Sequence, residues 1–145
     1  MIKNGRQYRI TKAQIAKFRQ ALESLAREPR NGMNPALLKA QREALQSQLG
    51  DLLAEAREYE ALQRSNPRAL KLDSLDEIPQ ALVRARIAKG LTQKQLAERV
   101  GLKEQQIQRY EATDYAAASF ARIRVVIRAL NLRIRTGALL EAAGE

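Results

Sequence analysis

The chain has 145 residues, which is enough for one ordinary domain or two small ones. It contains no His, Cys or Trp, so thiol nucleophiles, serine–histidine triads, and metal sites built on imidazole or thiolate are excluded. Lys and Arg number 26 against 16 Asp and Glu, so the protein is basic, with a net charge of +10. Hydrophobic residues make up 45% of the chain but aromatic residues only 4%, a composition that favours helices over sheets.

A basic tail followed by two long helices is expected over residues 1–64. Thr11 and Gln14 form a Thr-x-x-Gln capping box, which predicts that the first helix begins at Thr11. Apolar residues then recur at steps of three and four along one helix face, namely Ile15, Phe18, Leu22 and Leu25. The segment 29–32 and the pair Asn34-Pro35 predict the end of this helix, because Pro cannot continue a helix and Gly and Asn favour turns.

The second helix is expected to begin near Pro35 and to run to about Arg64. Its apolar stripe approaches heptad spacing and consists of Leu38, Leu45, Leu49, Leu52, Ala56 and Tyr59. A helix of this length with so narrow a stripe is not stable unpaired, so the stripe packs against the first helix, a second copy, or both. We therefore expect an antiparallel helical hairpin with a face left for a dimeric coiled coil. Residues 65–76 are expected to connect it to the next domain, against which Leu70, Leu72 and Leu75 pack.

The middle of the chain predicts short helices with clear boundaries. Residues 78–89 have helical apolar spacing, and Gly90 ends that helix. Thr92 and Gln95 form a second capping box, which opens a helix over residues 93–100.

A turn at Gly101 then leads into a second short helix, residues 103–111, whose buried side is Ile107 and Tyr110. Two short helices joined by a turn that contains Gly are typical of a helix-turn-helix. The second helix exposes long polar side chains of the kinds that reach base edges in a major groove, Gln to adenine, Arg to guanine and Glu to cytosine.

The stretch GLTQKQLAERVGL at 90–102, followed by IQRYE at 107–111, resembles the Cro/phage-repressor (XRE) helix-turn-helix family over residues 78–132. The resemblance implies that the third helix of the domain lies in the major groove of DNA. It implies DNA contacts by Thr92, Gln93, Lys94, Lys103, Glu104, Gln105, Gln108 and Arg109, and an internal salt bridge between Arg86 and Glu111.

Three of these positions carry further expectations. Thr92 and Gln93 begin the helix whose amides hold a phosphate in the family, a contact that helix termini favour. Lys103 stands where relatives carry a capping Ser or Thr, which predicts a less well capped recognition helix. Glu104 could read a base or simply favour the helix amino end through the dipole.

The last helix is expected after Ser119, with Asn131 as its left-handed stop. Its apolar residues are Phe120, Ile123, Val126, Ile127 and Leu130. Residues 132–135 then alternate apolar and basic side chains, which makes them a candidate short strand. A strand here resembles antitoxin-like members of the family, in which it pairs across a dimer.

The expected fold is therefore all-α: an amino-terminal helical hairpin with its basic tail at 1–64, a connector at 65–76, and a lambda-repressor-like helix-turn-helix domain at 77–145, with the candidate strand at its end. The basic tail is either a solvated end or an additional DNA contact. Residues 79–135 carry 12 Lys and Arg against 4 Asp and Glu, which suits phosphates.

The leading hypothesis is a sequence-specific regulator, a repressor, that binds double-stranded DNA as a homodimer on a palindromic operator. The two-fold axis could lie on the hairpin stripe or on 132–135, and we expect the strand to pair across it. The alternatives are an antitoxin that binds a toxin through its amino-terminal helices, and a nucleoid or phage-control factor that binds DNA loosely. No carboxylates form a catalytic or metal-ligand motif, so no enzyme, metal or cofactor is expected. A cytoplasmic location without a membrane span or signal segment is expected as well.

Overall fold

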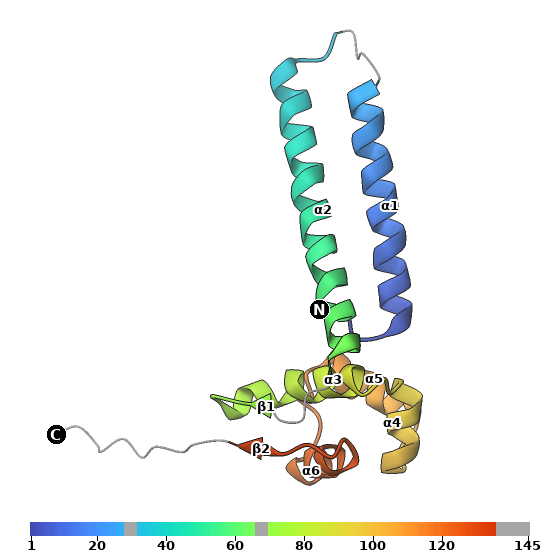
Figure 1. Cartoon of the computed structure of the whole chain (residues 1–145), viewed down its shortest axis with the longest axis vertical. Coiled ribbons are helices and arrows are strands. Elements are labelled where there is room, and N and C mark those ends of the chain that lie inside the picture. The colour runs from blue at the N-terminus through green and yellow to red at the C-terminus, as the bar shows by residue number, and fades with distance from the viewer. Residues whose placement is uncertain (28–31, 66–69, 136–145) are drawn as a thin grey trace, which may run out of the picture. The chain divides into compact units, whose positions relative to one another are not determined.

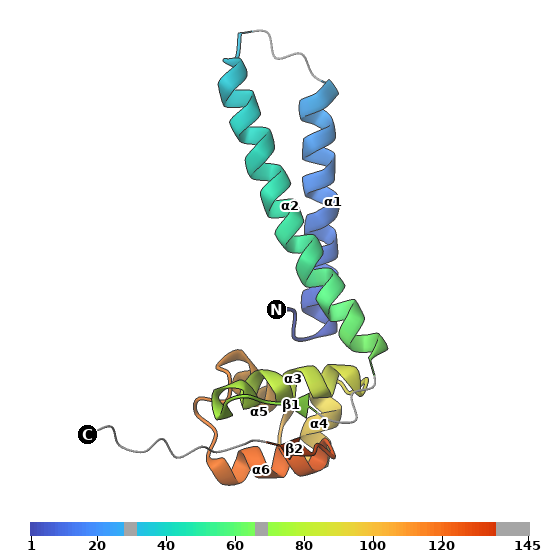
Figure 2. The same ribbon diagram turned by 60° about the vertical axis from the view of Figure 1, so that its left-hand side comes forward.

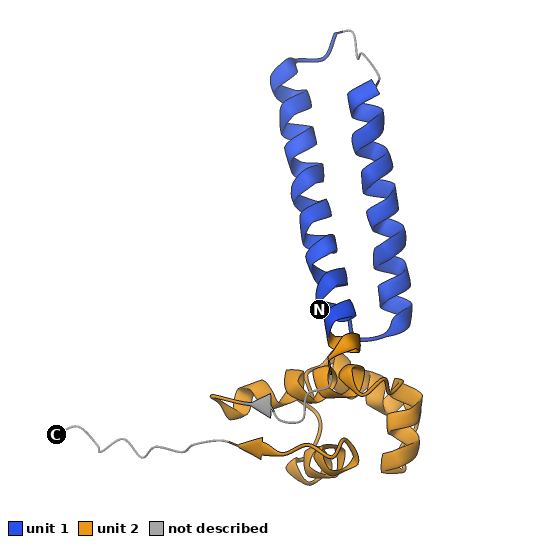
Figure 3. Cartoon of the chain, in the orientation of Figure 1, with its two compact units in different colours: residues 1–61 blue, residues 62–145 orange. Residues whose placement is uncertain are grey.

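The computed structural model describes residues 1–27, 32–65 and 70–135 (Figure 1). In these ranges it contains six α-helices and one pair of two-residue strands, which confirms the expected all-α class. The chain divides into two compact units, residues 1–61 and 62–145 (Figure 3).

The first unit is an antiparallel hairpin of two long helices, α1 (Gly5–Arg27) and α2 (Pro35–Arg64), which lie side by side in both views (Figures 1 and 2). The expected bounds of α2 are confirmed. The residues buried in the two helices are Thr11, Ile15, Ala56 and Tyr59. Leu45, Leu49 and Leu52 of the predicted stripe are less exposed than their polar neighbours but are only half-buried.

Polar and aromatic contacts join the open ends of the hairpin. The ring of Tyr8 stacks on that of Tyr59 with centroids 5.0 Å apart, and the Tyr8 hydroxyl donates to Glu60 at 2.5 Å. Lys12 pairs with the same carboxylate at 3.9 Å. These contacts fix α1 against the last third of α2.

The prediction that α1 begins at Thr11 is wrong, because the helix begins at Gly5. The Asn4 side chain accepts a hydrogen bond from the Gln7 backbone N–H at 2.9 Å, and the Gln7 side chain accepts from the Lys3 backbone N–H at 2.7 Å. Asn caps a helix as well as Thr does, so this earlier pair starts the helix. Thr11 instead lies on the buried face, and much of the expected basic tail is helix.

The second unit contains α3 (Ile78–Ala88), α4 (Gln93–Val100), α5 (Glu104–Ala112) and α6 (Phe120–Ala129). Each helix contributes to one core, whose most deeply buried apolar side chains include Leu82, Leu96, Ile107, Val126 and Leu130. The Ser119 side chain caps α6 by accepting from the Arg122 N–H at 3.1 Å, and Asn131 ends it with a φ of 49°, both as expected.

The connector contains structure that the sequence did not indicate. Strand β1 (Leu70–Lys71) pairs in parallel with β2 (Ile134–Arg135) of the same chain. Of the three connector leucines, Leu72 is buried as expected, whereas Leu75 is 67% exposed and that expectation is wrong. Ser74 caps a short 3-10 helix, η1 (Leu75–Glu77), and Leu75 is its first residue.

The side chain of Phe120 differs from the expectation. Phe120, expected on the apolar side of α6, is 71% exposed because it is the first residue after the cap and precedes the packed turns. Of the turn expected over residues 29–32, positions 29–31 lie outside the residues that the structure describes, as does the side chain of Leu70, and Gly32 has a positive φ of 99°.

Candidate nucleic-acid interface

Helices α4 and α5 form the helix-turn-helix, and local signals fix both ends of α4. The Thr92 side chain accepts from the Gln95 N–H at 3.1 Å, and the Gln95 side chain accepts from the Thr92 N–H at 2.9 Å, which confirms the predicted capping box. Gly101 has a φ of 69°, the left-handed conformation that ends a helix with least strain in glycine. The chain therefore turns sharply from α4 into α5.

The outer face of α5 consists of long polar side chains. Glu104, Gln105, Gln108 and Arg109 are all exposed, whereas Ile107 is buried. The Gln108 amide donates to the Glu104 carboxylate at 3.2 Å, one turn away on the same face. This contact orients Gln108 and gives Glu104 a role within the helix besides any contact with a base.

The amino end of α5 is only half capped. The Gln106 side chain accepts from the Lys103 backbone N–H at 3.0 Å, but the Lys103 side chain has no acceptor with which to cap the following amides. The expectation of a weaker cap at Lys103 is thus confirmed. Its exposed ammonium group leaves a positive charge beside free helix amides, an arrangement that attracts a phosphate.

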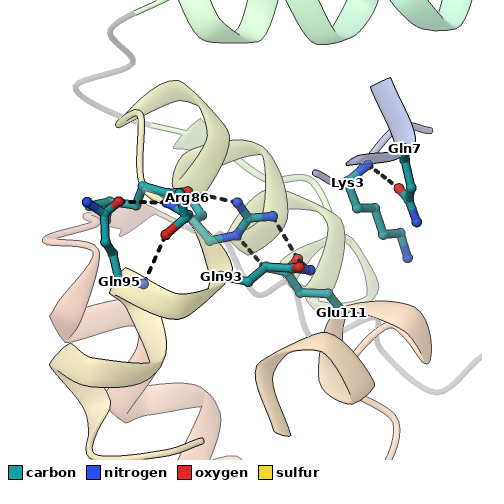
Figure 4. Close-up of polar contacts among 8 residues, drawn as sticks. Lys3, Gln7, Arg86, Gln93, Gln95 and Glu111 are labelled. Carbon is teal, nitrogen blue, oxygen red and sulfur yellow. Dashed lines mark hydrogen bonds and ion pairs between the residues drawn. The ribbon is translucent and has the colours of Figure 1, made fainter. Parts of the chain in front are cut away.

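The inner side of α5 carries a buried carboxylate, Glu111, paired with Arg86 of α3 (Figure 4). Arg86 donates from Nε to Oε1 at 2.5 Å and from Nη2 to Oε2 at 2.7 Å. Its Nη1 donates to the Leu91 carbonyl at 2.8 Å, and Gln93 of α4 donates to Glu111 Oε2 at 2.7 Å. Arg86 and Glu111 are 2% and 0% exposed, so the pair lies inside the domain, where together with Gln93 it joins α3, α4 and α5.

The structure separates the expected DNA contacts of α4 into two kinds. Thr92 and Lys94 are exposed, whereas Gln93 is 6% exposed and its side-chain amide bonds to Glu111. The Gln93 side chain thus bonds within the domain, while its backbone lies in the first turn of α4, where the resemblance implies a phosphate contact. The buried side chain of Gln93 instead helps to hold the carboxylate of Glu111 in α5.

Tyr115 is a buried residue in the segment between α5 and α6. Asp114 and Tyr115 both adopt positive φ angles, 48° and 57°, and the Tyr115 ring stacks on Tyr110 of α5 at 5.7 Å. Its hydroxyl is buried and finds no hydrogen-bond partner among the described residues. Burial raises the pKa of this hydroxyl well above its usual value, and the charge of Glu111 raises it further.

Comparison with known proteins identifies the same segment. Residues 82–136 match the sequence model of a helix-turn-helix family, and this match supports a helix-turn-helix domain of the Cro/C1 type (XRE family) in this segment. The match supports a DNA-binding transcriptional regulator. No curated protein and no solved structure matched the chain. Within the described ranges, no helix has both the length and the apolarity to cross a bilayer.

Glu111→Ala tests the buried pair. Removing the carboxylate leaves the Arg86 charge buried and uncompensated, so the free energy of unfolding should fall by about 3–5 kcal/mol. Urea denaturation followed by circular dichroism measures this. The control Glu104→Ala removes an exposed carboxylate from the same helix and should change stability by less than about 0.5 kcal/mol. Equal stability of Glu111→Ala and the wild type would contradict the role of the pair.

Tyr115→Phe tests the buried hydroxyl. Because a buried donor without a partner costs about 1–3 kcal/mol, its removal should raise the melting temperature while the stacked ring is kept. Thermal denaturation of the full chain measures the change. Tyr110→Phe, at a half-exposed position in the same stack, is the control and should change it little. A lower melting temperature for Tyr115→Phe would show that the hydroxyl is hydrogen-bonded in solution.

Proposed function

We propose that this protein is a sequence-specific transcription regulator, a repressor rather than an enzyme, that binds a palindromic operator as a homodimer. The role requires access to the chromosome, so we propose a cytoplasmic location.

The observation that carries the proposal is the exposed polar face of α5, a helix held in place by buried polar contacts to α3 and α4. Gln105 and Arg109 have the chemistry to pair with adenine and guanine. They project from a helix that the buried Arg86–Glu111 pair fixes to α3, with Gln93 of α4 bonded to the same carboxylate. Long side chains on a fixed helix support readout of a defined sequence, because each reaches the same base in every complex.

A dimer is proposed because one short recognition helix reads only a few base pairs, and two-fold symmetric dimers supply two half-sites about one helical turn apart. Two surfaces could carry the axis. The half-buried stripe around Leu45, Leu49 and Leu52 has apolar area to offer a second copy. Strand β2 has a strand neighbour, β1, on one edge only among the described residues, so its other edge could pair with a second β2.

Gln105→Ala and Arg109→Ala should each weaken binding to the preferred duplex by about 1–3 kcal/mol, the usual value of a base contact. Selection from random duplexes would identify the preferred site, and fluorescence anisotropy would then measure both affinities. Binding to a scrambled duplex should change less, since phosphate contacts carry no sequence information.

The matched controls are Gln46→Ala and Arg57→Ala, which remove the same residue types from exposed positions of α2 and should leave specific binding unchanged. If both α5 variants bind the selected duplex as well as the wild type does, readout by α5 is wrong.

A second candidate is an antitoxin whose hairpin binds a toxin protein while the helix-turn-helix domain regulates the operon. The half-buried apolar stripe of α2, Leu45, Leu49 and Leu52, favours this candidate, because a toxin could cover it in place of a second copy. A small toxin-like reading frame beside the gene would support it.

Sedimentation velocity of the full chain at micromolar concentration tests the dimer. We expect the free protein to sediment at twice the 16.3 kDa chain mass, and we expect two chains on each selected duplex. A monomer under both conditions would contradict the proposal. A chain that is monomeric alone but forms a stable complex with the product of an adjacent gene would favour the antitoxin role instead.

A further inference from the structure

Helix α1 carries a continuous basic strip on the side opposite its apolar stripe. The strip follows helical spacing, with steps of three or four residues, and comprises Arg6, Arg9, Ala13, Lys17, Gln20, Ser24 and Arg27. All seven residues are exposed. We call this set the α1 strip.

The α1 strip differs from an ordinary solvated helix face in its charge. It contains four cations and no acid, and the single acid of α1, Glu23, lies beside its far end. None of the four cations forms an ion pair with another residue in the described ranges. The exposed face of α2 in the same hairpin mixes both signs and contains the pair Lys39–Glu43 at 3.8 Å.

This arrangement costs the free helix some stability. Arg6 and Arg9 are like charges one turn apart, which repel. The first turn of α1 contains no acid, so Arg6 also lies unfavourably near the positive end of the helix dipole. A polyanion at this surface would remove both penalties.

We propose that the α1 strip is a second contact surface for duplex DNA and binds its phosphate backbone. The inference rests on the proposed function, because it requires that the helix-turn-helix domain of the same chain binds the duplex. From Arg6 to Arg27 the strip extends about 32 Å, close to one turn of B-DNA. Once one unit is bound, the second contact becomes intramolecular and strengthens binding without adding sequence information.

A lipid surface fits these observations less well. Amphipathic helices that bind membranes insert their apolar face into the bilayer. In α1 that face is occupied, because Ile15 is 3% exposed and the ring of Tyr8 stacks on Tyr59 within the hairpin. The α1 strip therefore has charge to offer a partner but no apolar anchor.

The test compares the full-length wild type with the triple variant Arg9→Gln, Lys17→Gln, Arg27→Gln. Anisotropy titrations on a long duplex with the selected site at its centre would be repeated over a range of NaCl concentrations. Each lost phosphate contact lowers the slope of log affinity against log salt by about 0.9, so we expect a slope shallower by about 2–3. Affinity at physiological salt should fall about tenfold or more, with the ratio of specific to scrambled binding unchanged.

The matched control is Lys39→Gln, Arg57→Gln, Arg64→Gln, which removes the same number of charges from exposed positions of α2 and should keep the wild-type slope. Melting temperatures would show that both variants fold. A wild-type slope in the α1 variant, or an equal loss in both variants, overturns the inference while sequence-specific binding by the wild type stands. The inference is also overturned if the α1 variant loses binding to anionic phosphatidylglycerol vesicles while its slope on DNA equals that of the wild type. A wild type that does not discriminate between duplexes refutes the proposed function itself.

Discussion

The orientation of the recognition helix depends on a charge that cannot be left unpaired. Glu111 lies on the inner side of α5 with no exposed surface, and burying such a carboxylate costs several kcal/mol unless it is paired and hydrogen-bonded. Arg86 of α3 and Gln93 of α4 meet this requirement. Helix α5 therefore cannot shift or rotate without separating these groups, and the position of its outer face follows from the pairing beneath it.

The same constraint decides which side chains of α5 face outward, on the surface proposed to meet DNA. Successive residues of a helix are about 100° apart, so a rotation by one position would turn Gln105 or Arg109 toward the core and Glu111 toward solvent. A carboxylate facing phosphate would repel it. The buried pair thus aligns the side chains proposed to read bases and also keeps a negative charge away from the proposed nucleic-acid surface.

Local chemistry made much of this domain predictable from the sequence. Thr92, Gly101 and Ser119 act on residues next to them, so the helix boundaries that they indicate are the ones observed. The pairing of β1 with β2 was not predictable. A strand of two residues is too short to show the alternation of side chains that marks a strand, and its partner is more than sixty positions away in the sequence. The stack of Tyr115 on Tyr110 depends on two consecutive residues with positive φ, and although Asp114 tolerates this conformation, a tyrosine rarely adopts it and nothing in the sequence indicates it at Tyr115.

At the amino end, two capping signals competed. Asn4 with Gln7 and Thr11 with Gln14 are both acceptable starts, and the pattern of residues does not rank them. The earlier start adds helix that carries Arg6 and Arg9, and it is this extension that makes the basic residues one surface rather than a solvated tail.

The division of charge between the two units has a consequence for selectivity. Residues 1–61 carry 11 Lys and Arg against 7 Asp and Glu, and residues 62–145 carry 15 against 9. Cations that meet phosphates strengthen binding to every duplex alike. Greater affinity from the amino-terminal unit therefore leaves the ratio of specific to non-specific binding to the few side chains of α5. For that ratio to be large, the fixed geometry around Glu111 matters more than the total charge of the chain.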